Sequence, residues 1–117
     1  MTPAKTYQDL RVWQSAHAFV IEVYACTRSF PKDELFGLTA QLRRSAVSVP
    51  SNIVEGFGRW SDKDKVKFYN IAEASLAEAD YQLFLAQELN YSDTATARNT
   101  ALDTKKLLAA FIKSIRP

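Results

Sequence analysis

The chain of 117 residues has few of the residues that break or cross-link a polypeptide: three glycines, four prolines and one cysteine, Cys26. So few glycines and prolines exclude an all-β fold, which needs many turns. A single cysteine excludes an internal disulfide and favours a reducing compartment. The N-terminal segment lacks an apolar stretch of signal-peptide length, and no apolar run approaches the ~20 residues that span a bilayer. We therefore expect a cytoplasmic protein without membrane contact.

Histidine is also scarce, and this limits the chemistry that the chain can perform. With His17 alone there is no pair of Glu-x-x-His motifs for a di-iron site, and His17 with Cys26 gives too few zinc ligands. The segment from Gly56 to Gly58 lacks the lysine and the strand of a phosphate-binding loop. Arg11 and His17 have roughly the spacing of a catalytic pair in some helical ribonucleases, but without their surroundings. We expect no catalytic residues, metal, cofactor or small-molecule substrate.

The residues that are abundant favour helix. Long stretches rich in Ala, Leu, Glu, Gln, Lys and Arg predict four helices, at about residues 7–29, 33–57, 61–89 and 92–115. Helices of this length with short connections pack antiparallel to their neighbours. The sequence therefore predicts one all-α domain over residues 1–117, an antiparallel up-and-down four-helix bundle.

Apolar residues recur at steps of three and four within each predicted helix, as on one helical face. In the first helix this face includes Val20 and Val23 and is broadened by Phe19 and Tyr24. The second helix, with Asp33 as its N-cap, has the most regular stripe: Leu35, Leu38, Leu42, Ala46, Val49, Ile53 and Phe57. The third is apolar on more than one side, so we expect another subunit to cover part of it.

Pro50 lies inside the second predicted helix. It removes one backbone N–H and crowds the carbonyl of Ala46, so a kink is expected there. Ser48 and Ser51 can bond to the disturbed backbone. Asn52 and Glu55 follow the kink.

Two long segments identify a resemblance: FPKDELFGLTAQLRRSAVSVPSNIVEGFGR and FYNIAEASLAEADYQLFLAQELNY. With LRVWQSAHAFVIEVY near the start, they resemble the four-helix-bundle proteins called 23S rRNA intervening-sequence proteins, over about residues 8–92. The resemblance implies a homo-oligomer, typically a pentameric ring around a central channel, and brings no established biochemical activity. The related accessory variability proteins of diversity-generating retroelements form similar rings and bind nucleic acid.

Charge is unevenly spread along the chain. Residues 34–67 and 93–117 are net basic, whereas residues 68–92 carry four acidic and no basic side chains. Such asymmetry suits contacts between subunits at least as well as nucleic-acid binding.

The basic residues around the second connection form the candidate nucleic-acid surface. These residues are Arg43, Arg59, Lys63, Lys65 and Lys67. Trp60 lies among them; its main interpretation is a core or interface anchor, and base stacking is the alternative because it sits in a loop beside basic residues. For the three lysines, a solvated helix face is the default interpretation and nucleic-acid contact the alternative.

The remaining candidates are structural or interface residues: Arg44, Pro50, Asn52, Glu55, Gly56 and Glu78. Adjacent Arg43 and Arg44 point about 100° apart, so Arg44 is expected to pair with a carboxylate of the next helix, such as Glu78. Glu55 either pairs with Arg59 at the i, i+4 spacing or is buried at a subunit boundary, which we favour.

Two functions are compatible with these patterns. The first is a homo-oligomeric accessory protein that binds RNA or DNA through repeated basic patches. The second is a protein-interaction scaffold whose charges serve subunit contacts and a protein partner, with no role in nucleic-acid binding.

Overall fold

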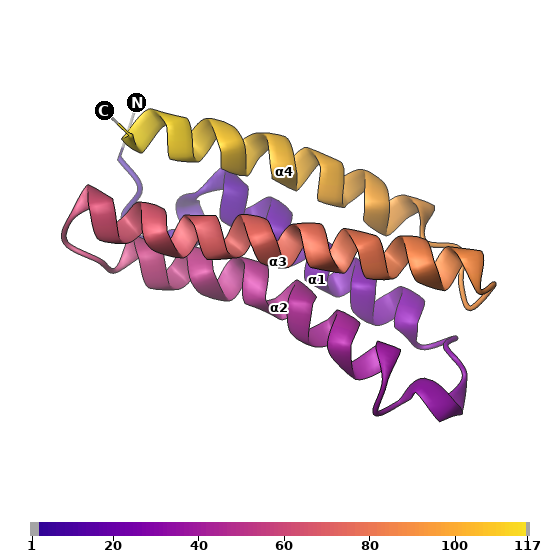
Figure 1. Ribbon diagram of the computed structural model, residues 1–117. Coiled ribbons are helices and arrows are strands. Elements are labelled where there is room, and N and C mark those ends of the chain that lie inside the picture. The colour runs from indigo at the N-terminus through magenta and orange to yellow at the C-terminus, as the bar shows by residue number, and fades with distance from the viewer. Residues whose placement is uncertain (1–2, 117) are drawn as a thin grey trace.

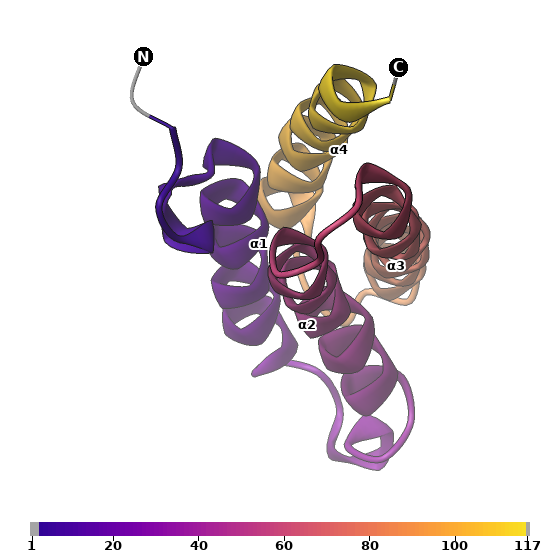
Figure 2. The same cartoon turned by 90° about the vertical axis from the view of Figure 1, so that its left-hand side faces the viewer.

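The computed structural model describes residues 3–116, in which four α-helices and two short 3-10 helices are present and strands are absent (Figure 1). The elements are η1 (Tyr7–Asp9), α1 (Arg11–Thr27), η2 (Lys32–Glu34), α2 (Leu38–Phe57), α3 (Asp62–Glu88) and α4 (Ala95–Ile115). Each helix packs against its two neighbours, and α1 lies diagonally across the bundle from α3 (Figure 2). The predicted all-α four-helix bundle is confirmed.

All four helices contribute fully buried side chains to one core. The largest of these are Phe19, Leu42, Ile53, Tyr69, Leu83 and Leu108. On α3 the core positions include the small residues Ala72, Ala79 and Ala86, which allow neighbouring helices to approach closely. Most stripe positions that the sequence predicted for α2 are buried, because a period of 3.6 residues keeps them on one face. Leu35 is an exception, at 52% exposure.

The predicted start of the second helix at Asp33 is wrong. Residues Lys32–Glu34 form the separate 3-10 helix η2, and α2 begins only at Leu38, after Gly37. The physical reason is the Glu34 side chain, whose Oε1 accepts a hydrogen bond of 3.1 Å from the backbone N–H of Leu38. Glu34 therefore caps α2 from outside, and Leu35 lies in the connection instead of in the helix.

The other helix starts differ less. The first α-helix begins at Arg11 because Tyr7–Asp9 form η1, and α3 begins after Ser61 as predicted, with Ser61 Oγ accepting from the backbone N–H of Asp64. The fourth helix begins after Thr94, not after Ser92 or Asp93. Thr94 is buried, and its hydroxyl donates to the carbonyl of Leu83 at 3.1 Å, which fixes the chain at that point.

Glu34 also joins the two connections at its end of the bundle. Its Oε2 accepts a hydrogen bond of 2.8 Å from the hydroxyl of Tyr91, which raises the pKa of the Tyr91 phenol. The Tyr91 ring packs against Phe30, with 5.6 Å between centroids. A Cβ at position 37 would lie 2.7 Å from Glu34 Oε1, which is too close for van der Waals contact. Any residue other than glycine would therefore displace the Glu34 carboxylate. The segment from Phe30 to Gly37 thus forms a specific capping structure.

We expect the Glu34→Ala variant to lose about 1 to 2 kcal/mol of unfolding free energy, because the Leu38 N–H and the Tyr91 hydroxyl both lose a charged acceptor. Urea denaturation would measure this loss. Asp33→Ala is the matched control, since Asp33 is exposed in the same 3-10 helix. Equal stability of the two variants would contradict the capping role.

The α-helix continues through Pro50, which is itself buried; the kink there stays a prediction. The local polar contacts differ from the expected ones. The side-chain amide of Asn52 donates to the carbonyl and the hydroxyl of Ser48, at 2.8 and 3.0 Å. The Ser48 hydroxyl in turn bonds to that of Ser75 on α3 at 2.8 Å. Asn52 therefore helps to join α2 to α3 within one chain.

At Gly56, α2 lies close to the Tyr69 side chain of α3. A Cβ at this position would lie 2.5 Å from Cε1 of Tyr69. The Tyr69 ring also packs against Phe111 of α4, with 4.9 Å between ring centroids. Burial raises the pKa of Tyr69 to about 12. Gly56 is therefore a packing residue between helices of the same chain.

Candidate nucleic-acid interface

One end of the bundle gathers basic side chains from α1, α3, α4 and the connection between α2 and α3. Because successive helices alternate in direction, the first residues of α1 and α3 lie beside the last residues of α2 and α4 (Figure 1). We call this the Trp60 end; its basic residues are Lys5, Arg11, Arg59, Lys63, Lys65, Lys67, Lys113 and Arg116. They outnumber the acidic residues of the same end, which are Asp9, Glu55, Asp62 and Asp64.

Trp60 is fully exposed, at 101% of its reference area. It lies in the short connection between α2 and α3, just before Ser61 caps α3. A large ring held in solvent between two ordered helices provides a stacking surface for a nucleotide base. A core role for Trp60 is excluded within the single chain by this exposure, whereas its interface role stays a prediction.

Two of the predicted basic residues already have partners in the chain. The guanidinium of Arg59 lies 3.3 Å from Glu55 Oε2 and over the Phe68 ring, 4.5 Å from its centroid. Lys65 Nζ donates to the carbonyls of Gly56 and Phe57, at 3.3 and 2.8 Å. Lys65 therefore caps the C-terminus of α2 and is poorly placed to bind phosphate.

Lys63 and Lys67 are exposed and form no ion pair within residues 3–116, so their ammonium groups are accessible. Lys113 and Arg116, from the last turn of α4, lie at the same end and are exposed as well. Sequence proximity alone did not group these α4 residues with Lys63. The alternation of helix directions, already predicted, was the signal that would have found them.

Arg43 does not belong to this surface, contrary to the prediction. Arg43 lies fourteen residues before Phe57, the last residue of α2, which corresponds to about 21 Å along the helix, and Arg59 lies beyond that end. Its Nε donates to the Thr27 hydroxyl at 2.9 Å, and its guanidinium lies 4.7 Å from the centroid of the Tyr24 ring. Arg43 therefore joins α2 to α1 near the opposite end of the bundle.

The predicted pair between Arg44 and Glu78 is not formed in the single chain. Both residues are exposed, and the ion pairs among residues 3–116 are Arg59 with Glu55 and Arg98 with Asp80. Glu78 instead accepts a hydrogen bond from Gln82. Glu55 is 59% exposed in the single chain, where it pairs with Arg59 at the i, i+4 spacing; its burial at a subunit boundary stays a prediction.

Neither a metal centre nor a membrane span emerges from the described part of the chain. No three His, Cys, Asp or Glu side chains of residues 3–116 lie close enough to hold a metal ion. None of the helices in that range has the length and hydropathy needed to cross a bilayer. His17 stacks on Trp13, with 5.0 Å between the ring centroids.

The fold and the basic end together define a class: small antiparallel four-helix-bundle proteins with an exposed aromatic residue among basic side chains. The profile of the 23S rRNA-intervening sequence protein family matches residues 8–113, so the chain belongs to that family.

Among solved structures, the chain is similar to a protein with unknown function from the S23 ribosomal protein family of Bacteroides thetaiotaomicron, with a TM-score of 0.79. The two chains are 24% identical, over 87% of this chain and 95% of that one, which establishes the shared fold. A comparison with curated proteins gave no match.

Proposed function

We propose that this protein is a non-catalytic bundle that associates with copies of itself, as a pentameric ring, and contacts RNA or DNA through its Trp60 end. The observation that carries the proposal is the full exposure of Trp60 beside the accessible Lys63 and Lys67. An aromatic ring for stacking and basic side chains for phosphate are the two components of sequence-independent binding to single strands.

Self-association is supported by apolar side chains that a single bundle leaves in solvent. On α3, Ile71, Tyr81 and Phe84 are 41%, 61% and 44% exposed, on the sides that face away from the core. A helix that is apolar on several sides is normally covered on several sides. A ring would also repeat the Trp60 end once per subunit, so weak individual contacts would add to useful avidity. The pentameric number comes from the family resemblance.

The test of the proposal is binding of fluorescent single-stranded RNA and DNA over a range of salt concentrations. About four phosphate contacts would give a roughly 50-fold loss of affinity between 50 and 200 mM salt. We expect Lys63→Ala with Lys67→Ala to flatten the salt dependence, and Trp60→Ala to weaken binding about tenfold through lost stacking. Lys32→Ala, at the opposite end of the bundle, is the control and should bind as the unmodified protein does.

The second candidate is a protein-interaction scaffold without nucleic-acid binding. It is favoured by the engagement of Arg59 and Lys65 within the chain and by the acidic residues Asp62 and Asp64 beside them. Absence of RNA and DNA binding at low salt, or affinity that salt does not change, would reject the nucleic-acid role and leave this candidate.

A further inference from the structure

The side of α1 that faces away from the core is basic at its two ends and apolar in the middle. We call it the α1 outer face; its exposed residues are Arg11, Gln14, Ala18, Ile21, Ala25 and Arg28. Ile21 is 58% exposed and is flanked one turn away on each side by the small residues Ala18 and Ala25. Neither arginine makes an ion pair within residues 3–116. None of these exposed residues is acidic, and the half-buried Glu22 lies at the edge of the face.

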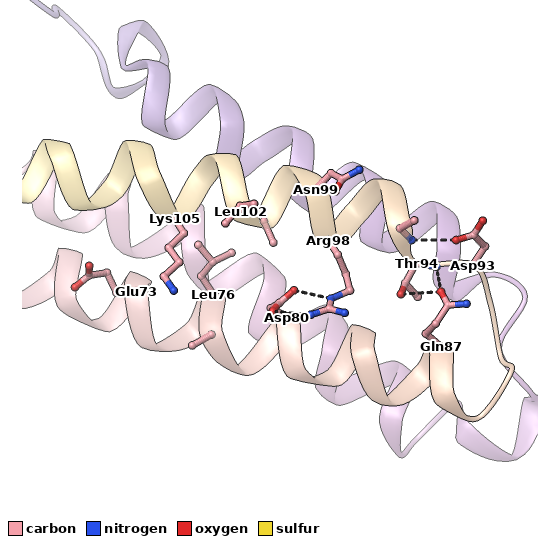
Figure 3. A pocket seen from close by; sticks show the side chains of 13 residues that line it. Glu73, Leu76, Asp80, Gln87, Asp93, Thr94, Arg98, Asn99, Leu102 and Lys105 are labelled. Carbon is pink, nitrogen blue, oxygen red and sulfur yellow. Dashed lines mark hydrogen bonds and ion pairs between the residues drawn. The ribbon is translucent and has the colours of Figure 1, made fainter.

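The opposite side of the bundle has a groove of about 690 Å³ between α3 and α4 (Figure 3). Leu76 and Ala101, each 3% exposed, form its apolar floor, and Ala77 and Leu102 border it. Leu102 is 50% exposed, although it is a large apolar side chain. This α3–α4 groove offers an elongated apolar surface that nothing in the single chain covers.

The groove carries a small net negative charge, whereas the exposed charges of the α1 outer face are basic. The acidic side chains of the groove are Glu73, Asp80 and Asp93, and they outnumber the basic Arg98 and Lys105. Arg98 holds Asp80 with two hydrogen bonds, at 3.0 and 3.3 Å (Figure 3). Glu73 forms no ion pair among the described residues.

The dimensions of the two surfaces are also compatible. Along α3 the groove extends from Glu73 to Gln87, about 21 Å, and Arg11 to Arg28 covers about 25 Å of α1. A helix approaches another closely where its facing residues are small, and here Ala18 and Ala25 leave Ile21 as the one large apolar side chain that projects from the face. The groove's apolar floor at Leu76 and Ala101 suits such a side chain.

We infer that the α1 outer face of one copy docks in the α3–α4 groove of the next copy. The inference rests on the self-association proposed above and specifies its surfaces. The two surfaces lie on different sides of the bundle, because α1 and α3 are diagonally opposite (Figure 2). Two copies related by a twofold axis therefore cannot each place the α1 outer face in the groove of the other. The contact is therefore heterologous, so each copy donates a face to one neighbour and accepts a face from another.

This arrangement gives a sharp test with two variants, Ile21→Glu and Leu102→Glu. Each blocks one surface and leaves the other intact, and both positions are exposed, so the single chain should fold. Ile21→Glu alone and Leu102→Glu alone should be monomeric by native mass spectrometry. A mixture should form a dimer and nothing larger, because only one intact face meets one intact groove. Ala110→Glu, on the exposed side of α4 away from the groove, should assemble as the unmodified protein does.

The outcomes separate this inference from the proposed self-association. If the unmodified protein assembles and either glutamate variant forms an assembly of the same mass, the docking surfaces are wrong and self-association stands. Two monomeric variants that remain monomeric when mixed also overturn the heterologous pairing. If the unmodified protein is itself a monomer, self-association and the inference fail together. Circular dichroism of each variant verifies that helix content is unchanged.

Discussion

Replacing Phe19 by alanine is expected to lower the unfolding free energy by about 3 to 5 kcal/mol. The Phe19 side chain is fully buried in the core, at 0% exposure, and its removal leaves a cavity that the surrounding helices fill only in part. Urea denaturation followed by circular dichroism measures the change. Because self-association would add to apparent stability, all variants are compared at the same protein concentration.

Tyr24→Ala on the same helix is the matched control for the Phe19 variant. The Tyr24 ring is 39% exposed and lies under the guanidinium of Arg43. Truncation removes this cation–π contact and some apolar cover but opens no internal cavity, so we expect a loss of about 1 kcal/mol. If Tyr24→Ala cost as much as Phe19→Ala, the assignment of the two faces of α1 would be contradicted.

The Gly56→Ala variant is expected to lose about 2 to 3 kcal/mol, although alanine favours helix over glycine by up to about 1 kcal/mol. The added methyl group would lie 2.5 Å from Cε1 of Tyr69. Since the Tyr69 ring is buried and packs against Phe111 of α4, a shift of the ring would disturb that contact as well. Urea denaturation again measures the effect.

Gly58→Ala provides the comparison two residues further along. A Cβ at Gly58 would meet no atom closer than 3.8 Å, and its φ of −82° is accessible to alanine. We therefore expect this variant to be as stable as the unmodified protein or slightly more stable. Loss of stability in Gly58→Ala equal to that in Gly56→Ala would show that glycine is needed for backbone reasons rather than for the approach of Tyr69.

The number and order of the helices were predictable from the sequence, because apolar periodicity and the scarcity of glycine and proline are local properties. Which side of each helix faces the core was less predictable. Phe19 and Tyr24 both extend the apolar stripe of α1, yet one is buried and the other is exposed. Periodicity cannot distinguish them, since the edge of a stripe depends on the position of the neighbouring helices. The start of α2 was missed because a side-chain cap from Glu34 has no periodic signal.

The candidate site was predicted only in part. Lys63, Lys67 and Trp60 are where the charge pattern indicated, whereas Arg43 lies far along α2 and contacts Tyr24. Grouping residues by sequence position ignores the 1.5 Å rise per helical residue, which separates positions on one helix and brings different helix ends together. Lys113 could therefore be assigned to the Trp60 end only once each helix end had been placed in three dimensions.

The alternating directions of the four helices have an electrostatic consequence for the Trp60 end. Two helix N-termini and two helix C-termini meet there, so the partial positive and negative charges of the peptide dipoles nearly cancel. The field that an approaching polyanion would experience therefore originates in side chains and not in the backbone. Acetylation of accessible ammonium groups such as those of Lys63, Lys67 and Lys113 would weaken that field while leaving the framework of the bundle unaltered.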